Sequence, residues 1–297
     1  MNIHGEKTMF DYHIHPNYSI DAEGEVDEFC QVALDIGLKE IAFTTHMDTD
    51  RVAEDCYVNV RGKRVDVGSS FWFEDYESTI RTAGDHYKDL GLQVILGVEV
   101  DCYPGVQDAL PDKFYSTDFD LIIGSVHLID HIAISANGRA NEAFRKFSVE
   151  ELGERYYTIL IDSMDLEIFD ILAHIDLYRR FGEIFYGNKI HEIWKPHLEG
   201  LSKKMLSKNV GFEVNTSPLR KGMQQPMPEE RIIKALRRAG IDTVTVGSDA
   251  HFPADIGKGI KTALDMIKES GFEGLSVYRR RKATFVPWSD LTDEKEN

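Results

Sequence analysis

Metal-binding side chains stand at the ends of seven short apolar segments of this sequence. Six of the eleven histidines occupy such ends, alongside carboxylates and one amide; the residues are His13, His15, His46, Glu99, Asp101, His127, His174, Asp176, Glu213, Asn215, Asp249 and His251. Imidazole and carboxylate donors without cysteine suit Zn, Mn or Fe better than a structural zinc cluster does. Two or more such ions favour hydrolysis, because one lowers the pKa of a bound water while the others hold phosphoryl oxygens.

The apolar segments that carry these residues are predicted strands, and amphipathic stretches between them are predicted helices. The strands are Phe10–Ile14, Glu40–Thr44, Gln93–Val100, Leu121–Val126, Asp170–Ala173, Gly211–Val214 and Thr243–Val246. Apolar residues at helical spacing predict helices over Val26–Leu38, Glu74–Leu90, Ser148–Ile161, His191–Lys208 and Glu229–Ala239. This alternation predicts a parallel sheet, and about seven units in one domain favour a closed α/β barrel. In a barrel the carboxyl ends of all strands meet at one face, so the ligands are expected to lie together.

Taken singly, each of these residues has an ordinary structural alternative. His127 or His174 alone would be a hydrogen-bonded core histidine, and Glu99 alone a salt-bridged carboxylate. Their joint occurrence favours a metal centre, since buried carboxylates are costly without partners. His131 lies in a loop near the expected site, and its role stays open. The histidines outside the pattern are expected to be structural or exposed: His4, His86, His191 and His197.

Two long polar segments interrupt the alternation, at Asp48–Phe73 and His131–Phe147. Loops of this length in a compact domain are usually lids or substrate loops. The side chains expected to close over a small organic group are Tyr57, Phe71, Trp72, Phe73 and Arg145. Packing in the core is an equally open alternative for the aromatic residues.

The composition limits the classes of protein and partner. A chain of 297 residues with 42% hydrophobic content is expected to form a single domain over 1–297, with a frayed charged tail at 290–297. A net charge of -17 argues against binding to nucleic acid or a membrane surface. A small phosphorylated metabolite remains compatible if metal ions reverse the field locally. Nothing in the sequence indicates an oligomeric state.

The cysteines and the apolar runs bear on location. Cys30, Cys56 and Cys102 are scattered and odd in number, which predicts a reducing, cytoplasmic setting without a disulfide framework. Met1–Phe10 lacks a charged and then apolar leader, so no signal peptide is expected. No apolar run approaches 18 residues, and a membrane span is therefore not expected.

Seven ordered segments resemble the polymerase and histidinol phosphatase (PHP) superfamily. They are DYHIHPNYSID, FTTHMD, LGVEVD, GSVH, AHIDLYRRFG, FEVNTSPLRK and GSDAH, and they run from Asp11 to His251. The resemblance implies a distorted (β/α)7 barrel of the PHP type. It also implies three divalent metal ions per chain, for which Zn, Mn and Fe all remain open.

The resemblance also implies which residues hold each ion. The first ion would take His13, His15, Glu99 and Asp249; the second would share Glu99 and add His127 and His174; the third would take Asp21, His46 and His251. Asp21 departs from those relatives that have histidine there, although Asp is a competent ligand. Among these residues Glu99, Asp249 and His251 are expected to act in catalysis.

Within the superfamily, HIDLYRRFG and VNTSPLRKG resemble the monofunctional histidinol-phosphate phosphatases, in which nearby arginines bind phosphate. This resemblance implies Arg180, with Arg179 beside it, and Arg220 as phosphate ligands. A solvated surface charge is the alternative for each arginine. Glu213 would contact either the substrate amine or a metal-bound water, and both roles stay open.

The expected reaction is therefore hydrolysis of L-histidinol phosphate, a step of histidine biosynthesis, by a metal-activated hydroxide. Three divalent ions and the carboxylates Asp21, Glu99 and Asp249 would give the pocket a charge of about +3, which suits phosphate despite the acidic chain. One alternative is a phosphodiesterase for a small or cyclic nucleotide-type diester, and another is a phosphatase for a different small metabolite. A metal-binding module without catalysis is a third. An amidohydrolase is disfavoured, because no lysine follows a middle strand.

Overall fold

Seven parallel strands form a nearly closed barrel in the computed structural model, which describes residues 10–53, 56–136 and 138–291. The strands are β1 (Phe10–Ile14), β2 (Glu40–Met47), β5 (Gln93–Asp101), β6 (Leu121–Ser125), β9 (Ile171–Leu172), β10 (Gly211–Asn215) and β11 (Val244–Gly247). They pair in that order, and a parallel bridge from Ile14 to Ala250 joins the first strand to the chain after the last. The predicted α/β barrel with seven strands is confirmed.

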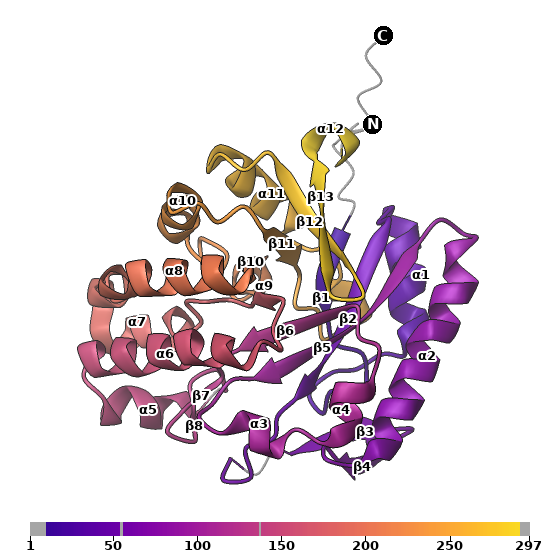
Figure 1. Ribbon diagram of the computed structural model, residues 1–297, viewed down its shortest axis with the longest axis horizontal. Helices are drawn as coiled ribbons and strands as arrows, with labels where there is room; N and C mark the ends of the chain where they lie inside the picture. Colours follow the sequence, from indigo (N-terminus) through magenta and orange to yellow (C-terminus); the bar gives the residue numbers. More distant parts are fainter. Residues whose placement is uncertain (1–9, 54–55, 137, 292–297) are drawn as a thin grey trace.

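Helices cover the outside of the barrel, with α1 and α2 on one side of the strands and α6 and α8 on the other (Figure 1). The longer helices are α1 (Val26–Ile36), α2 (Ser70–Lys88), α6 (Val149–Ser163), α7 (Arg179–Tyr186), α8 (Leu198–Lys208), α10 (Glu230–Arg238) and α11 (Ile260–Glu269). Short ones are α3 (Val106–Ala109), α4 (Asp112–Ser116), α5 (Ala140–Lys146), α9 (Ser217–Arg220) and α12 (Trp288–Leu291). Four of the five predicted helices are confirmed with small shifts at their ends.

The fifth predicted helix, His191–Lys208, is divided in the structure. Only α8, its second part, is α-helical; the chain before it forms the 3-10 turns η2 (Gly187–His191) and η3 (Lys195–His197). Pro196 lies within η3. Proline has no amide hydrogen and disfavours the α conformation of the preceding residue, so the helix begins only after it.

The expected lid over 48–73 is corrected in part. Ser69 caps α2, its hydroxyl accepting a hydrogen bond from the Phe71 amide, so the helix begins four residues before its predicted start. Trp72 and Phe73 lie on the buried face of this helix and are fully buried in the core. The preceding chain forms a hairpin of β3 (Tyr57–Val60) and β4 (Lys63–Asp66). Trp72 and Phe73 therefore pack in the core, which was the alternative to a role in a lid.

A C-terminal hairpin of β12 (Gly274–Arg279) and β13 (Lys282–Pro287) places arginines against the amino-terminal ends of the strands. Arg279 donates to both carboxylate oxygens of Glu40, at the start of β2, over 2.8 and 2.5 Å. Arg281 donates from Nη2 to Asp170, just before β9, over 3.1 Å. Each of these carboxylates is less than 8% exposed, so the hairpin supplies charge partners at the barrel face opposite the strand carboxyl ends.

Replacing Arg281 with Ala is expected to lower the free energy of unfolding by about 1–3 kcal/mol, because the buried Asp170 carboxylate loses its charged donor. Activity of the folded variant is expected to stay near that of the wild type, since this contact lies at the far face of the barrel. Urea unfolding measures the change, and Lys282→Ala on the same hairpin is the matched control. A change below about 0.5 kcal/mol, which is usual for surface positions, would contradict this role.

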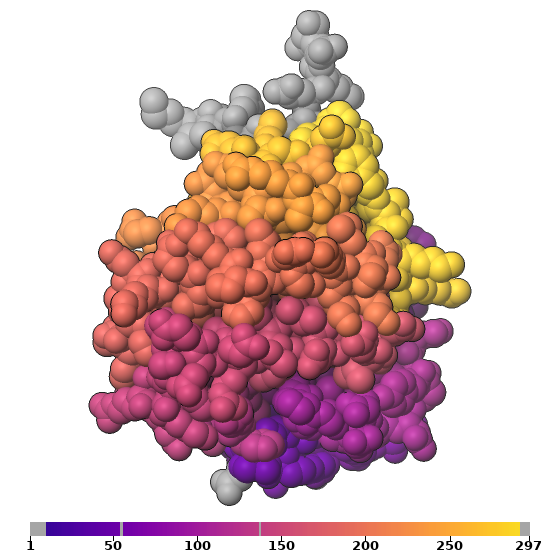
Figure 2. Space-filling view, turned by 60° about the vertical axis from the view of Figure 1, so that its left-hand side comes forward, coloured from indigo at the N-terminus to yellow at the C-terminus, as the bar shows by residue number. Residues whose placement is uncertain are grey.

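The main hydrophobic core runs through the described chain, from Phe10 in the first strand to Leu291 in the last helix, and a small second cluster joins Ala53, Leu128 and Ala133. In the space-filling view the first and second halves of the chain lie directly against each other (Figure 2). Within the described residues, no helix is long and apolar enough to cross a membrane. Residues 1–9, on which the signal-peptide expectation rests, and residues 292–297 of the tail expected to fray lie outside the described residues, whereas Asp290 and Leu291 belong to α12.

Candidate active site

The carboxyl ends of the strands bring all nine predicted metal ligands to one face of the barrel. His13 lies within β1, His46 within β2 and Glu99 within β5. The other six follow strand ends: His15 and Asp21 after β1, His127 after β6, His174 after β9, and Asp249 and His251 after β11. Side chains that are far apart in the sequence therefore share one cluster.

Glu99 lies at the centre of this cluster and is 1% exposed. Each of its carboxylate oxygens faces imidazole nitrogens from several histidines. Oε2 lies 3.3 Å from His13 Nε2, 3.6 Å from His15 Nε2 and 2.8 Å from His46 Nδ1, whereas Oε1 lies 3.1 Å from His174 Nε2 and 3.6 Å from His127 Nε2. Two candidate metal groups share this carboxylate: His13 with His15, and His127 with His174.

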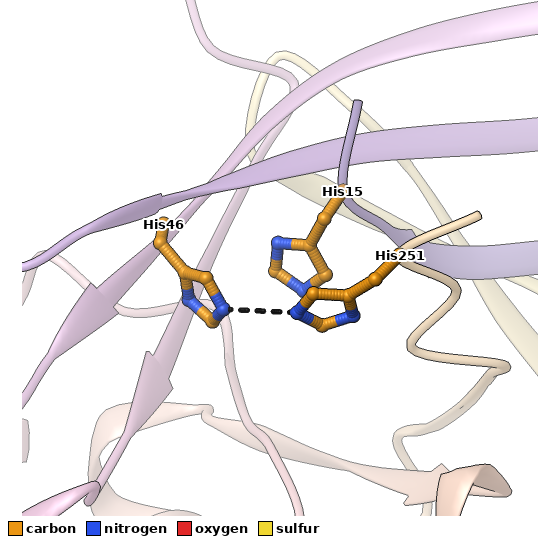
Figure 3. A group of neighbouring side chains, drawn as sticks. All are labelled: His15, His46 and His251. Atoms are coloured by element: carbon orange, nitrogen blue, oxygen red, sulfur yellow. Dashed lines mark hydrogen bonds between the residues drawn. The ribbon is translucent and has the colours of Figure 1, made fainter. Parts of the chain in front are cut away.

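A third candidate group lies beside the first two. Figure 3 shows the rings of His15, His46 and His251 close together, with 3.4 Å between His46 Nε2 and His251 Nε2. Asp21, 58% exposed, places Oδ2 3.3 Å from His251 Nε2 at the edge of this group. Asp249 connects the groups, since its Oδ1 lies 3.3 Å from His15 Nε2 and 3.4 Å from His251 Nδ1.

Two residues of the cluster hold their backbone in the left-handed region, with φ of 29° at His174 and 54° at Asp249. This region is uncommon for residues other than glycine. Neighbouring groups fix the turn at Asp249: its amide donates to the His13 carbonyl over 2.8 Å, and Arg220 Nη2 donates to its carbonyl over 3.0 Å. Strained backbone of this kind concentrates at functional sites, where the surroundings hold it in place.

Several donor atoms of the cluster suit metal ions because they are buried without a hydrogen-bond partner. They include Nε2 of His13 and His15 and Oε2 of Glu99. A buried polar atom left in this way costs about 1–3 kcal/mol, which a bound cation would offset. Nitrogen and carboxylate oxygen without sulfur are donors for Zn, Mn or Fe. The residues present therefore fit divalent metal ions.

The protonation states of four side chains in the cluster also suit a metal ion. Burial opposes the ionisation of Glu99 and Asp249, yet His13 beside Glu99 and His15 beside Asp249 help to hold both pKa values well below the ordinary range. Burial lowers the pKa of His15 well below its usual value and that of His127 to about 3. Ionised carboxylates and neutral imidazoles are the forms that donate lone pairs to metals. His46 differs, because Glu99 and Asp21 raise its pKa to about 10 despite its burial, so its imidazole would lose a proton when a metal binds.

Glu213 does not reach the pocket where its substrate or water contact was expected. It is fully buried on β10, and its Oε1 lies 2.7 Å from His13 Nδ1. Although burial opposes it, this carboxylate together with Glu99 keeps the pKa of His13 well above its ordinary range. A carboxylate bound to one ring nitrogen fixes the tautomer and directs the other nitrogen toward a metal. Glu213 is thus placed to orient His13 rather than to touch substrate.

Glu213→Gln is expected to weaken metal affinity by about 10- to 100-fold, the usual effect of changing a group that orients a ligand. The KM of the metal-saturated variant should remain within about twofold of wild type, because Glu213 lies away from the pocket. Metal titration and steady-state kinetics separate the two effects. A raised KM with unchanged metal affinity would instead return Glu213 to the substrate site.

The cluster of candidate ligands opens into a pocket of about 630 Å³. Three cations line it: Arg180, Arg220 and Lys221. Acidic and apolar side chains from the two long segments also line it, among them Asp48, Asp50, Ala53, Ala133 and Ala136. The pocket therefore offers basic groups for an anion beside the cluster of candidate ligands, and a mixed acidic and apolar lining for the remainder of a small molecule.

The arginines of the pocket differ in how they are held. Arg220 donates to the carbonyls of Ser248 and Asp249 over 2.7 and 3.0 Å, which fixes its guanidinium beside the cluster. Arg180 lines the pocket with its guanidinium over the Phe181 ring. Arg179 is buried and donates to Asp176 and to a backbone carbonyl, so it supports the fold rather than facing the pocket.

The two long segments meet at the pocket. His131, at the turn between β7 (Leu128–Ile129) and β8 (Ile132–Ala133), places Nδ1 2.6 Å from Asp50 Oδ2. This contact ties the two pocket-lining segments together. Of the side chains expected to close over the substrate, Tyr57, Phe71 and Arg145 are exposed and are absent from the pocket lining within the described chain.

The sequence did not identify Asp48 and Lys221 as residues of the pocket. It placed Asp101 at a strand end but gave it no role. Asp48 follows His46 by two residues and Asp101 follows Glu99 by two. Residues two apart on a strand face the same side, which was the available signal for both carboxylates. Asp101 Oδ1 accepts the His127 amide over 2.9 Å and so supports the loop after β6. Lys221 carried no signal beyond its position next to Arg220.

Comparison with protein families gives one match: the family described as PHP domain matches residues 11–217. A probable histidinol-phosphatase of Deinococcus radiodurans is 27% identical over 278 residues, covering 92% of this chain and 98% of the relative. The histidinol-phosphatase of Lactococcus lactis is 24% identical over 275 residues, covering 92% and 95%. The likeness to these relatives thus extends over nearly the whole of each chain.

Among solved structures, the histidinol phosphate phosphatase of Lactococcus lactis, in complex with zinc, L-histidinol and phosphate, superimposes with a TM-score of 0.75. The two chains are 22% identical, and the alignment covers 94% of this chain and 99% of that one. A protein from Listeria monocytogenes that has been assigned as a histidinol phosphatase gives a TM-score of 0.69 at 20% identity, over 85% of this chain and 99% of that one. These likenesses show a shared barrel fold.

Proposed function

This chain belongs to the PHP domain family, and on that premise we propose that it is a metal-dependent phosphatase that converts L-histidinol phosphate to L-histidinol and phosphate. The observation that carries the proposal is the cluster of nine ligand residues opening into a pocket that Arg180 and Arg220 line. Relatives named histidinol-phosphatase support this substrate. The Lactococcus lactis structure with L-histidinol and phosphate supports it as well.

We propose three divalent ions, of Zn, Mn or Fe, at the groups of side chains described above. One would lie among His13, His15, Glu99 and Asp249, one among Glu99, His127 and His174, and one among Asp21, His46 and His251. Such ions supply an activated water and neutralise the charge of the phosphoryl group. Glu99, Asp249 and His251 act in catalysis by holding these positions around the reacting phosphate.

The arginines of the chain bind and orient the phosphate. Arg180 brings a planar guanidinium into the pocket, where two parallel hydrogen bonds to phosphoryl oxygens orient the ester. Arg220 adds charge beside the cluster, and its bonds to the Ser248 and Asp249 carbonyls keep the turn that presents Asp249 in place. Both arginines thereby align the phosphorus with the metal cluster.

The organic part of the substrate lies against the lining from the two long segments. Asp50, which is 4% exposed and oriented by His131, suits the ammonium group of an amino alcohol. Ala53, Ala133 and Ala136 leave room for a small planar ring. The net charge of -17 argues against a nucleic acid as the substrate.

Domain organisation and location complete the proposal. The continuous core from Phe10 to Leu291 supports a single domain. The three cysteines are free and buried, which supports a reducing, cytoplasmic compartment.

A substrate panel with metal-loaded protein tests the reaction class. Phosphate release is compared for L-histidinol phosphate, L-serine phosphate, p-nitrophenyl phosphate, bis-p-nitrophenyl phosphate and a cyclic nucleotide. The proposal expects kcat/KM to be highest for L-histidinol phosphate and negligible for both diesters. Preferred cleavage of a diester would replace it with a phosphodiesterase, and preference for another monoester would replace the substrate alone.

A further inference from the structure

Lys221 is a cation of the pocket that has no role in the function proposed so far. It directly follows α9, the short helix that ends at Arg220, and its backbone amide donates to the Pro218 carbonyl over 3.0 Å. Its side chain lines the pocket together with Arg180 and Arg220. The short turn after α9, held by this backbone hydrogen bond, therefore places Lys221 in the lining of the pocket.

The three pocket cations differ in what already engages them. Arg220 has two bonds to backbone carbonyls, and its Nε lies 3.6 Å from Asp255. Within the described residues, the side chains of Lys221 and Arg180 make no hydrogen bond or ion pair with a protein group. The Arg180 guanidinium lies over the Phe181 ring. Two cations of the pocket thus retain all their donors for a ligand.

The electrostatic surroundings of Lys221 point to an anionic ligand. Its environment includes the negative Asp249 and the positive Arg180 and Arg220. Desolvation lowers the pKa of Lys221, Asp249 partly offsets this, and the two arginines lower it further. Like charges gathered in one pocket repel one another, and an anion between them relieves that repulsion.

We propose that Lys221 is a further phosphate-binding residue of this site and that it holds the phosphoryl group together with Arg180. This inference rests on the proposed phosphatase function and assigns a residue that the family resemblance did not. The lysine ammonium is a compact charge with three hydrogen-bond donors, whereas the arginine guanidinium is planar and can donate two parallel hydrogen bonds. Between them, the two groups would offer positive charge and hydrogen-bond donors to the phosphoryl oxygens.

Calorimetric titration of the metal-loaded protein with inorganic phosphate tests the assignment without relying on turnover. Lys221→Met keeps the aliphatic stem and removes the charge, while Lys221→Arg keeps the charge. Lys204→Met, on the outer face of α8 where Lys204 pairs with Asp165, removes one positive charge away from the pocket and is the matched control. Metal content is measured for every variant.

Lys221→Met is expected to raise the Kd for phosphate and the KM for the ester by roughly 10- to 100-fold, as for loss of a charged hydrogen bond. Lys221→Arg should recover most of the affinity, and Lys204→Met should match wild type. A Kd for Lys221→Met within about twofold of wild type, or a loss accompanied by loss of metal, would overturn the assignment. Wild-type protein that binds phosphate but hydrolyses no monoester would refute the proposed function and leave this test of Lys221 intact.

Discussion

Glu99→Gln is expected to lower kcat/KM for phosphate-ester hydrolysis by well over 100-fold. Five histidines approach the two oxygens of this carboxylate, and no other described side chain joins as many members of the cluster. Changing a group that only orients a ligand costs about 10- to 100-fold, so losing the carboxylate that two proposed metal positions share should cost more. The amide has the same shape, and the fold should therefore remain intact.

Steady-state kinetics and metal analysis on the same preparation measure the effect of Glu99→Gln. Glu167→Gln, which makes the same chemical change at an exposed residue paired with Lys208, is the control and should keep wild-type activity. A Glu99→Gln enzyme with full metal content and more than a tenth of wild-type activity would remove Glu99 from the catalytic set.

Metal removal is expected to abolish activity and to lower the melting temperature substantially. The cluster buries ionised Glu99 among imidazoles whose donor atoms lack partners, and bound ions stabilise only the folded state. A ligand at 1,000 times its Kd stabilises by about 4 kcal/mol, which corresponds to roughly 10 °C in a domain approaching this size. Scanning calorimetry of chelator-treated and reconstituted protein measures the shift.

Glu99→Gln also serves as the control for the metal experiment. Its melting temperature should respond much less to added metal than that of wild type, because the shared ligand is missing. Equal melting temperatures for metal-free and metal-loaded wild type, with metal content verified in both, would show that the cluster is not coupled to folding.

The barrel, and the meeting of its strand-end histidines and carboxylates at one face, could be predicted from the sequence because both depend on local signals. Each strand is a short buried run, and each ligand stands within it or shortly after it, so chain order alone placed His46, Glu99 and His127 at one face. The parallel sheet then required those ends to converge. The family resemblance added Asp21, which stands in a loop where no periodic pattern could identify it.

Features that depend on contacts between distant segments could not be predicted in this way. Glu213 lies at a strand end like a ligand, and only the contact with His13, two hundred residues earlier, shows that it orients one. Arg281 gave no signal, since Asp170 appeared to be an ordinary residue at the start of a strand. Trp72 stayed open between a lid and core packing, because only the structure shows that Ser69 caps α2 and so extends the helix over this residue.

Phosphate release from L-histidinol phosphate by purified protein loaded with Mn or Zn tests the central claim most directly. The account predicts turnover in the ordinary enzyme range, on the order of 1–1,000 per second, that is lost on chelation and in Glu99→Gln. Negligible release of phosphate from this ester by protein whose bound metal has been verified would contradict it.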